Sequence, residues 1–162
     1  YMSSVEVAYE LKEATRFLIA STSEMMAYGM PYAIVGEFLL GNPDYGSLCE
    51  GFHDFYSTYE MMPCGTLAVT DCSELDNMAA IMKSINDRYV FDYSLQGELQ
   101  GLDGYTPVIF YDFADYVLTL CSDPVLTARF REQLERLVPY KPHTSKFYSR
   151  AKGTFPYVLF RG

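Results

Sequence analysis

Two pairs of reactive side chains have spacings that place both members on one face of a helix. Cys49 and His53 are four residues apart in a predicted helix, which suits a metal pair or a thiol–imidazole pair. Two ligands make an incomplete metal site, so a structural role is favoured over both. Asp112 and Asp115 are three residues apart, a spacing that suits acid–base chemistry. They fall in the first turn of a predicted helix, where the dipole favours acids, and we interpret them as structural.

A third candidate is the predicted loop from Thr22 to Pro31. Its acid, Glu24, can meet a guanidinium or ammonium group of a substrate. The alternatives are a solvated carboxylate or a helix cap. Thr22, Ser23, Met25, Tyr28 and Gly29 share this loop with Glu24. Gly29 also fits a turn residue with positive φ.

Three predicted elements position this loop. Residues 3 to about 15 have apolar side chains at every third position, which predicts a helix. Ser3 and Glu6 have the spacing of a capping box at its start. The apolar run at residues 16–21 predicts a strand buried in a sheet. After the loop, residues 32–40 have a helical pattern that Gly and Pro residues then end.

Strands and helices alternate along the rest of the chain. Such alternation is typical of an α/β sheet built with crossover connections. A strand is predicted at residues 65–71, and helices are predicted at residues 47–59, 73–88, 111–121 and 124–138. Residues 96–107 are expected to be irregular. Two extended segments, residues 137–141 and 155–160, contain prolines that are typical of edge strands.

The composition is that of a folded, acidic protein. The 162 residues carry a formal net charge of −9, which disfavours nucleic acid as a partner because phosphate is repelled. No apolar run is long enough to span a membrane. The four cysteines lack a Cys-x-x-Cys pair, so neither a metal nor another cofactor is predicted. We expect them to be reduced and partly buried, with one disulfide as the alternative.

Several motifs, taken in order, resemble the clostripain-like cysteine peptidases over nearly the whole chain. The nucleophile segment of that family reads Asp-x-Cys-x-Met-x-x-Val/Ile-Glu, and residues 1–6 match everything after the cysteine. Residues 21–24 and 28–32 together resemble the family's Ser-x-x-Glu…Gly-Trp/Met-Pro-Tyr loop. Weaker resemblances follow at residues 67–75, 110–116 and 158–162.

The resemblance implies a caspase-like three-layer α/β/α sandwich. Residues 1–72 would form the C-terminal part of that domain, and residues 73–162 a mostly helical C-terminal subdomain with short edge strands that continues further in family members. A Cys-His dyad would precede Tyr1, and its thiolate would lie at the amino end of the first helix.

The resemblance also implies a function. The protein would cut peptide or protein substrates after Arg or Lys and would be exported, with its signal upstream of this chain. This chain would supply scaffold and part of the specificity pocket. The resemblance implies that the substrate-binding residues are Thr22, Ser23, Glu24, Met25, Tyr28 and Gly29. Its partner would be the preceding part of the same protein, either continuous with it or a separate chain. The alternative is a catalytically inactive caspase-like binding or structural module that has lost the dyad.

Overall fold

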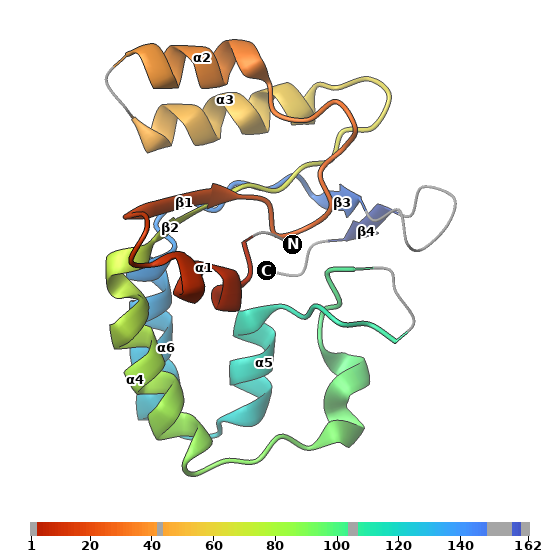
Figure 1. Cartoon of the computed structure of the whole chain (residues 1–162). Coiled ribbons are helices and arrows are strands. Elements are labelled where there is room, and N and C mark those ends of the chain that lie inside the picture. Colours follow the sequence, from red (N-terminus) through yellow and green to blue (C-terminus); the bar gives the residue numbers. More distant parts are fainter. Residues whose placement is uncertain (1–2, 42–43, 104–106, 149–156, 160–162) are drawn as a thin grey trace.

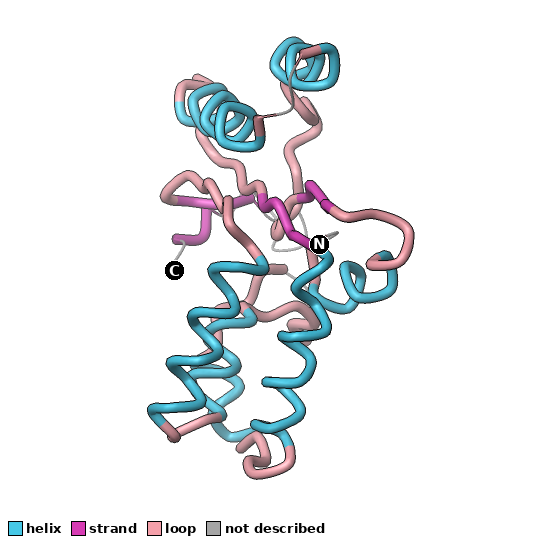
Figure 2. Tube along the Cα trace, turned by 90° about the vertical axis from the view of Figure 1, so that its left-hand side faces the viewer, coloured by secondary structure: helices cyan, strands magenta, loops and turns pink. Residues whose placement is uncertain are grey.

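Two short strands form the centre of the molecule, with helices on both sides of them (Figures 1 and 2). The computed structural model of the protein describes residues 3–41, 44–103, 107–148 and 157–159. Strand β1 (Phe17–Ala20) pairs with β2 (Ala68–Asp71), with Phe17 opposite Asp71 and Ala20 opposite Ala68. The predicted central strands at residues 16–21 and 65–71 are therefore present, each shorter than expected.

The helices form one layer on each side of these strands, as Figure 1 shows. The first layer holds α2 (Tyr32–Leu40) and α3 (Tyr45–Ser57), and the second holds α1 (Val5–Leu11), α4 (Leu75–Asn86) and α6 (Pro124–Leu137). Alternate residues of β1 serve the two layers, because Ile19 packs with the α3 cluster while Leu18 packs with the α4–α6 cluster. Packing on both faces, with each residue partly buried, explains why the strand is continuously apolar.

The strand pairing differs from the sequence prediction. Crossover connections join parallel strands, whereas β1 and β2 are antiparallel. The physical reason is the connection between them: α2 and α3 form a pair of packed helices that leads the chain away from the strands and back to the same end. The chain therefore enters β2 beside the end of β1, at Ala20 and Ala68.

A late segment extends the strand pair on the β2 side. The N–H of Val69 donates to the carbonyl of Tyr140 over 2.8 Å, and the N–H of Leu67 donates to Pro142 over 3.0 Å. Beyond it, β3 (Lys146–Tyr148) pairs with β4 (Tyr157–Leu159) in antiparallel fashion. The first predicted extended segment, residues 137–141, is confirmed only in part, because Tyr140 bridges β2 whereas Leu137 belongs to α6 and β3 lies in the predicted connecting loop. Of the second, residues 157–159 form β4, and residues 155, 156 and 160 lie outside the described residues.

The helix starts follow the predicted capping chemistry with one correction. Asp123 caps α6 as expected, because its carboxylate accepts from Val125 over 2.8 Å. For α1 the cap is Ser4, whose Oγ accepts from Val7 over 3.3 Å, and not Ser3. Ser3 is engaged elsewhere, since its N–H donates to the carbonyl of Ser21 over 3.3 Å. The helix also ends at Leu11, sooner than predicted.

Three helical elements remain. Two 3₁₀ helices, η1 (Cys72–Glu74) and η2 (Tyr93–Glu98), and helix α5 (Phe113–Leu120) complete the described elements. The domain boundary expected at residue 72 stays a prediction. Across that position, Ala8 and Cys72 share one buried cluster with side chains of α4 and α6. Within the described ranges no helix is both long and apolar enough to cross a membrane.

Candidate functional site

The loop predicted to bind substrate begins on a buried cluster of hydroxyl groups. Ser21 Oγ lies 2.7 Å from Thr66 Oγ1, and Ser23 Oγ lies 3.0 Å from the same atom. Thr66 Oγ1 also accepts from the N–H of Ser23 over 3.2 Å. Because Thr66 lies two residues before β2, the start of the loop is attached to the central strand pair.

Glu24 follows this cluster and is held from a second side. Its backbone forms an antiparallel bridge with Tyr148, the last residue of β3. Glu24 and Thr22 are half-buried, so both side chains are only partly shielded from solvent. Met25 turns toward the first helical layer and packs against the α3 cluster. Of the predicted loop residues, the structure thus leaves Glu24 and Thr22 in an intermediate position between core and surface.

The far end of the loop is a tight turn at Gly29. Its φ is +75°, as predicted, and its N–H donates to Met26 over 2.8 Å. The Gly29 carbonyl accepts a hydrogen bond from the phenol of Tyr56 on α3. Burial raises the pKa of Tyr56 to about 12, so this phenol stays protonated and able to donate at neutral pH.

Tyr28 stands out from the loop as an exposed ring. Its side chain is 61% exposed and its ring centre lies 5.7 Å from Phe55 and 5.3 Å from Tyr59. Both neighbours come from the end of α3 or just after it. The three rings form a small aromatic surface beside the loop, with one face available to an apolar group.

The start of α1 lies directly against the loop. The hydrogen bond from Ser3 to Ser21 joins the turn before α1 to the first loop residue. The turn before α1 is therefore attached to the chain at the start of the loop. Helix starts also have N–H groups without intrahelical partners, which favour an anion nearby.

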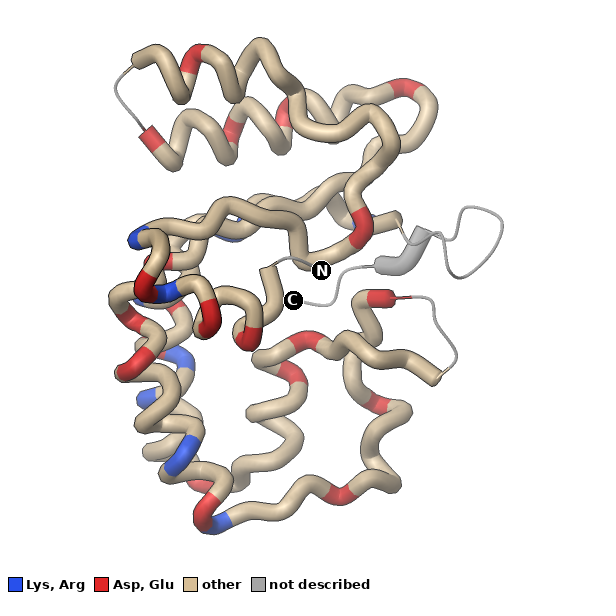
Figure 3. Tube along the Cα trace, viewed as in Figure 1, with Lys and Arg blue, Asp and Glu red and all other residues tan. Residues whose placement is uncertain are grey.

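The loop and the first helical layer contain no Lys or Arg side chain. Between residues 17 and 82 the sequence has no Lys or Arg, whereas it has nine Asp or Glu residues. Figure 3 shows acids but no basic residue on α2, α3 and the loop. The cations nearest in sequence already have partners, since Lys12 pairs with Asp76 and Arg16 with Asp71. Residues 17–82 therefore carry an excess of negative charge, which attracts cations.

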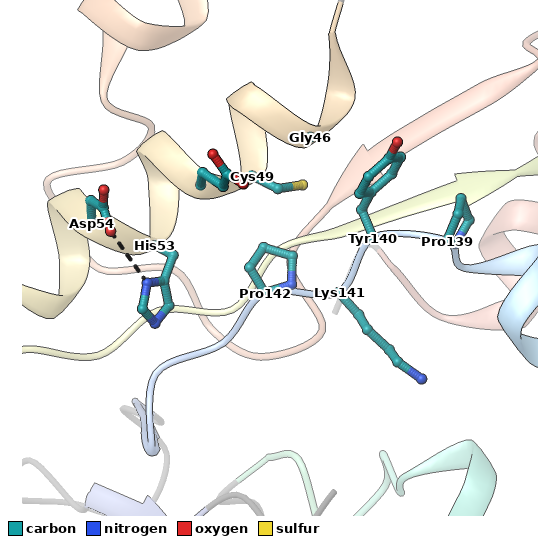
Figure 4. Close-up of a pocket in the computed structure, with 9 residues that line it drawn as sticks. Gly46, Cys49, His53, Asp54, Pro139, Tyr140, Lys141 and Pro142 are labelled. Carbon is teal, nitrogen blue, oxygen red and sulfur yellow. Dashed lines mark ion pairs between the residues drawn. The ribbon is translucent and has the colours of Figure 1, made fainter.

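Cys49 and His53 do lie on one face of α3, where both line an open groove of about 480 Å³ (Figure 4). The Cys49 side chain is 4% exposed, and burial raises its pKa to about 11. Such a thiol stays protonated at neutral pH and is a weak nucleophile. His53 turns instead to Asp54, with 3.6 Å between Nδ1 and Oδ1. The other groove-lining residues are Gly46, Glu50, Asp54, Pro139, Tyr140, Lys141 and Pro142.

The remaining candidates have structural roles. Asp112 caps α5 by accepting from the N–H of Asp115 over 2.9 Å, and Asp115 accepts from Gln100 over 3.0 Å. Burial raises the pKa of Asp112. The four cysteines are free and buried, as expected. No group of three or more His, Cys, Asp or Glu side chains able to hold a metal ion occurs in the part of the chain that the structure describes.

Sequence reasoning missed three residues that hold the loop: Tyr56, Thr66 and Tyr148. Each is distant in sequence from the residue it contacts, so no local spacing reveals the pair. Of the three, only Thr66 could have been suspected from the sequence, because it is a polar residue at the start of a predicted buried strand. A buried hydroxyl requires a hydrogen-bond partner, and that requirement points to another element.

The layered α/β fold and the loop that follows its first strand define the caspase-like class of cysteine peptidases. Residues 1–128 match the sequence profile of the clostripain family, peptidase C11. The chain belongs to the clostripain family. No curated protein sequence matches the chain.

Solved structures of family members match the whole chain. It is 60% identical to a clostripain from Bacteroides thetaiotaomicron in complex with the peptide inhibitor BTN-VLTK-AOMK, with a TM-score of 0.94. It is 60% identical to a secreted C11 cysteine protease of the same organism, with a TM-score of 0.95. An inactive zymogen C11 protease from Parabacteroides distasonis is 29% identical, with a TM-score of 0.85. This chain spans 71%, 45% and 47% of those three chains.

Proposed function

We propose that the protein is a cysteine endopeptidase that cuts after Lys or Arg, and that this chain supplies the scaffold and part of its specificity pocket. A Cys-His dyad in the preceding part of the protein supplies the chemistry. The thiolate attacks the peptide carbonyl, the histidine protonates the departing amine, and water releases the acyl group. The loop residues Thr22, Ser23, Glu24, Met25, Tyr28 and Gly29 surround the bound side chain.

The observation that carries this proposal is the contact between Ser3 and Ser21. The family motif places the nucleophilic cysteine directly before Tyr1, and the same contact brings the start of α1 to the start of the loop. A thiolate at that position is therefore close to Glu24 and its neighbours. One bound peptide can then reach the nucleophile with its scissile bond and the loop with its side chain.

Charge supports a basic side chain in the pocket. Glu24 is the acid of the loop, and residues 17–82 contain no Lys or Arg. A carboxylate in such surroundings forms charge-assisted hydrogen bonds with an ammonium or guanidinium group. The inhibitor held by the 60% identical clostripain has the peptide sequence VLTK, which ends in lysine.

The outer edge of β1 is suited to bind the preceding part of the protein. The N–H of Cys72 donates to the carbonyl of Arg16 over 2.7 Å, so the backbone groups of Leu18 face β2 and those of Ile19 face outward. Within the described residues no strand pairs with this edge, and its sequence has neither charge nor proline to protect it. A strand from the preceding part of the protein covers it and carries the dyad to the loop.

We also propose that the protein is exported. One relative of 60% identity is described as secreted, and the acidic, folded character of the chain suits a secreted peptidase that acts on peptide or protein substrates.

The test uses the full-length protein with fluorogenic peptides that place Lys, Arg or norleucine before the scissile bond. We expect hydrolysis of the Lys and Arg peptides, slow or no hydrolysis of the norleucine peptide, and loss of activity when the cysteine before Tyr1 is replaced by alanine. Serine or glycine at that position, with no thiol-dependent hydrolysis, would establish the alternative of an inactive binding module. Equal rates on all three peptides would exclude the basic pocket.

A further inference from the structure

We infer that Thr66 is a positioning residue that fixes the substrate-binding loop through a closed, directional circuit of hydroxyl hydrogen bonds. This inference rests on the proposed function, because it assigns the loop's rigidity to the binding of a basic side chain. Thr66 itself touches no substrate in this scheme. It acts through Ser21 and Ser23, the two residues that lead into Glu24.

The direction of each hydrogen bond follows from counting protons. A serine or threonine hydroxyl has one proton to donate and accepts up to two. Ser21 Oγ donates its proton to the carbonyl of Ser23 over 2.9 Å. The 2.7 Å contact between Ser21 and Thr66 must therefore be a donation by Thr66. With that proton used, the 3.0 Å contact between Ser23 and Thr66 must be a donation by Ser23.

The circuit leaves Thr66 Oγ1 fully satisfied. It donates once, to Ser21, and accepts twice, from the hydroxyl and the N–H of Ser23. The exposed fractions are 1% for Ser23, 2% for Thr66 and 7% for Ser21, so water does not replace a missing partner. The hydrogen bonds have one arrangement of protons, and they hold the backbone of the loop start in one conformation.

Thr66 is itself held from the opposite side. Its backbone forms an antiparallel bridge with His143. Thr144 contacts the neighbouring Gly65 three times: its N–H donates to the Gly65 carbonyl over 3.0 Å, and its Oγ1 accepts from the Gly65 N–H over 2.8 Å and lies 3.2 Å from the Gly65 carbonyl. The same late segment then reaches Glu24 through Tyr148. Glu24 thus directly follows Ser23, a member of the circuit. It is also bridged to the late segment that holds Thr66 in place.

The test substitutes Thr66→Val in the full-length enzyme, which keeps the shape and removes the hydroxyl. We expect kcat/KM on the Lys peptide to fall about ten-fold, mainly through KM, since the loop start loses its fixed conformation. Inactivation of the nucleophile by iodoacetamide, which needs no bound basic side chain, should keep its wild-type rate. Thr66→Ser keeps the hydroxyl and should retain the wild-type KM.

The matched control is Thr70→Val, a buried threonine in β2 that takes no part in the circuit. It should leave KM unchanged. If Thr66→Val does not fold, Ser21→Ala breaks the same circuit with a smaller change and should raise KM in the same way. Wild-type KM in the folded Thr66→Val or Ser21→Ala enzyme, or an equal rise with Thr70→Val, would overturn the inference. A wild-type enzyme without thiol-dependent hydrolysis would instead refute the proposed function.

Discussion

The phenol of Tyr56 donates a hydrogen bond to the backbone carbonyl of Gly29 and so joins helix α3 to the turn of the substrate-binding loop. Tyr56 is 1% exposed, and its ring lies so close to Gly65 that a Cβ on that glycine would come within 2.9 Å of it. One side chain therefore contacts both the loop and the segment leading into β2. The loop is held at its start by Thr66 and at its turn by Tyr56.

Removing this phenol tests the second attachment. Tyr56→Phe should lower the free energy of unfolding by about 1 kcal/mol, because the Gly29 carbonyl loses its donor. Urea denaturation measures the change. The control is Tyr59→Phe, since among the described residues the Tyr59 hydroxyl reaches the Met61 sulfur alone, at 4.0 Å. Equal losses in the two variants would show that the Tyr56 hydrogen bond contributes nothing specific.

Glu24 gives the direct test of charge recognition. Glu24→Gln should lower kcat/KM for Lys and Arg peptides, because the amide lacks the negative charge. The loss corresponds to about 1–3 kcal/mol of transition-state stabilisation. The control is Glu37→Gln, an exposed acid on α2 that should have no effect. Steady-state kinetics with both peptides decides the matter, and unchanged values for both would remove Glu24 from the pocket.

Local sequence signals predicted the helices and central strands well. The pattern over residues 32–40 predicts α2 with its observed bounds, and Asp123 with Pro124 predicts the start of α6. These features depend on residues a few positions apart, which is the range over which periodicity and capping act. The Ser3 cap failed because a long-range hydrogen bond to Ser21 takes the Ser3 N–H.

Long-range features were less predictable. The antiparallel pairing of β1 and β2 depends on how α2 and α3 pack, which the alternation of strands and helices does not determine. The loop could be located from its glycine, proline and acid. Its attachments to Tyr56, Thr66 and Tyr148 could not, because each joins segments that only the tertiary structure brings together.

Gly29 provides a test of loop conformation that is independent of charge. Gly29→Ala should cost about 1–2 kcal/mol of folding stability, since an L-residue is strained at a φ of +75°. Space is not the obstacle, because the nearest atom to an added Cβ is the Tyr32 hydroxyl at 3.8 Å. The control is Gly36→Ala in helix α2, where an added Cβ meets nothing within 4 Å. That variant should be more stable than wild type by about 0.5–1 kcal/mol. Thermal unfolding measures both, and a stabilising Gly29→Ala would contradict the assigned backbone conformation.

Cys49→Ala tests whether the buried thiol takes part in catalysis and how its ionisation affects stability. With the dyad upstream, the variant should keep full activity on Lys peptides, whereas replacing the cysteine before Tyr1 should abolish it.

Burial raises the pKa of Cys49 from 9.0 to about 11 in the folded protein. The unfolded chain therefore ionises first, and the contribution of this thiol to stability is fully present below about pH 9 and is lost as pH rises toward 11. Urea denaturation between pH 7 and 11 should show a shallower decline for Cys49→Ala than for wild type. Loss of activity in a folded Cys49→Ala protein would make Cys49 the nucleophile, and an unchanged decline would show that another group carries the pH dependence.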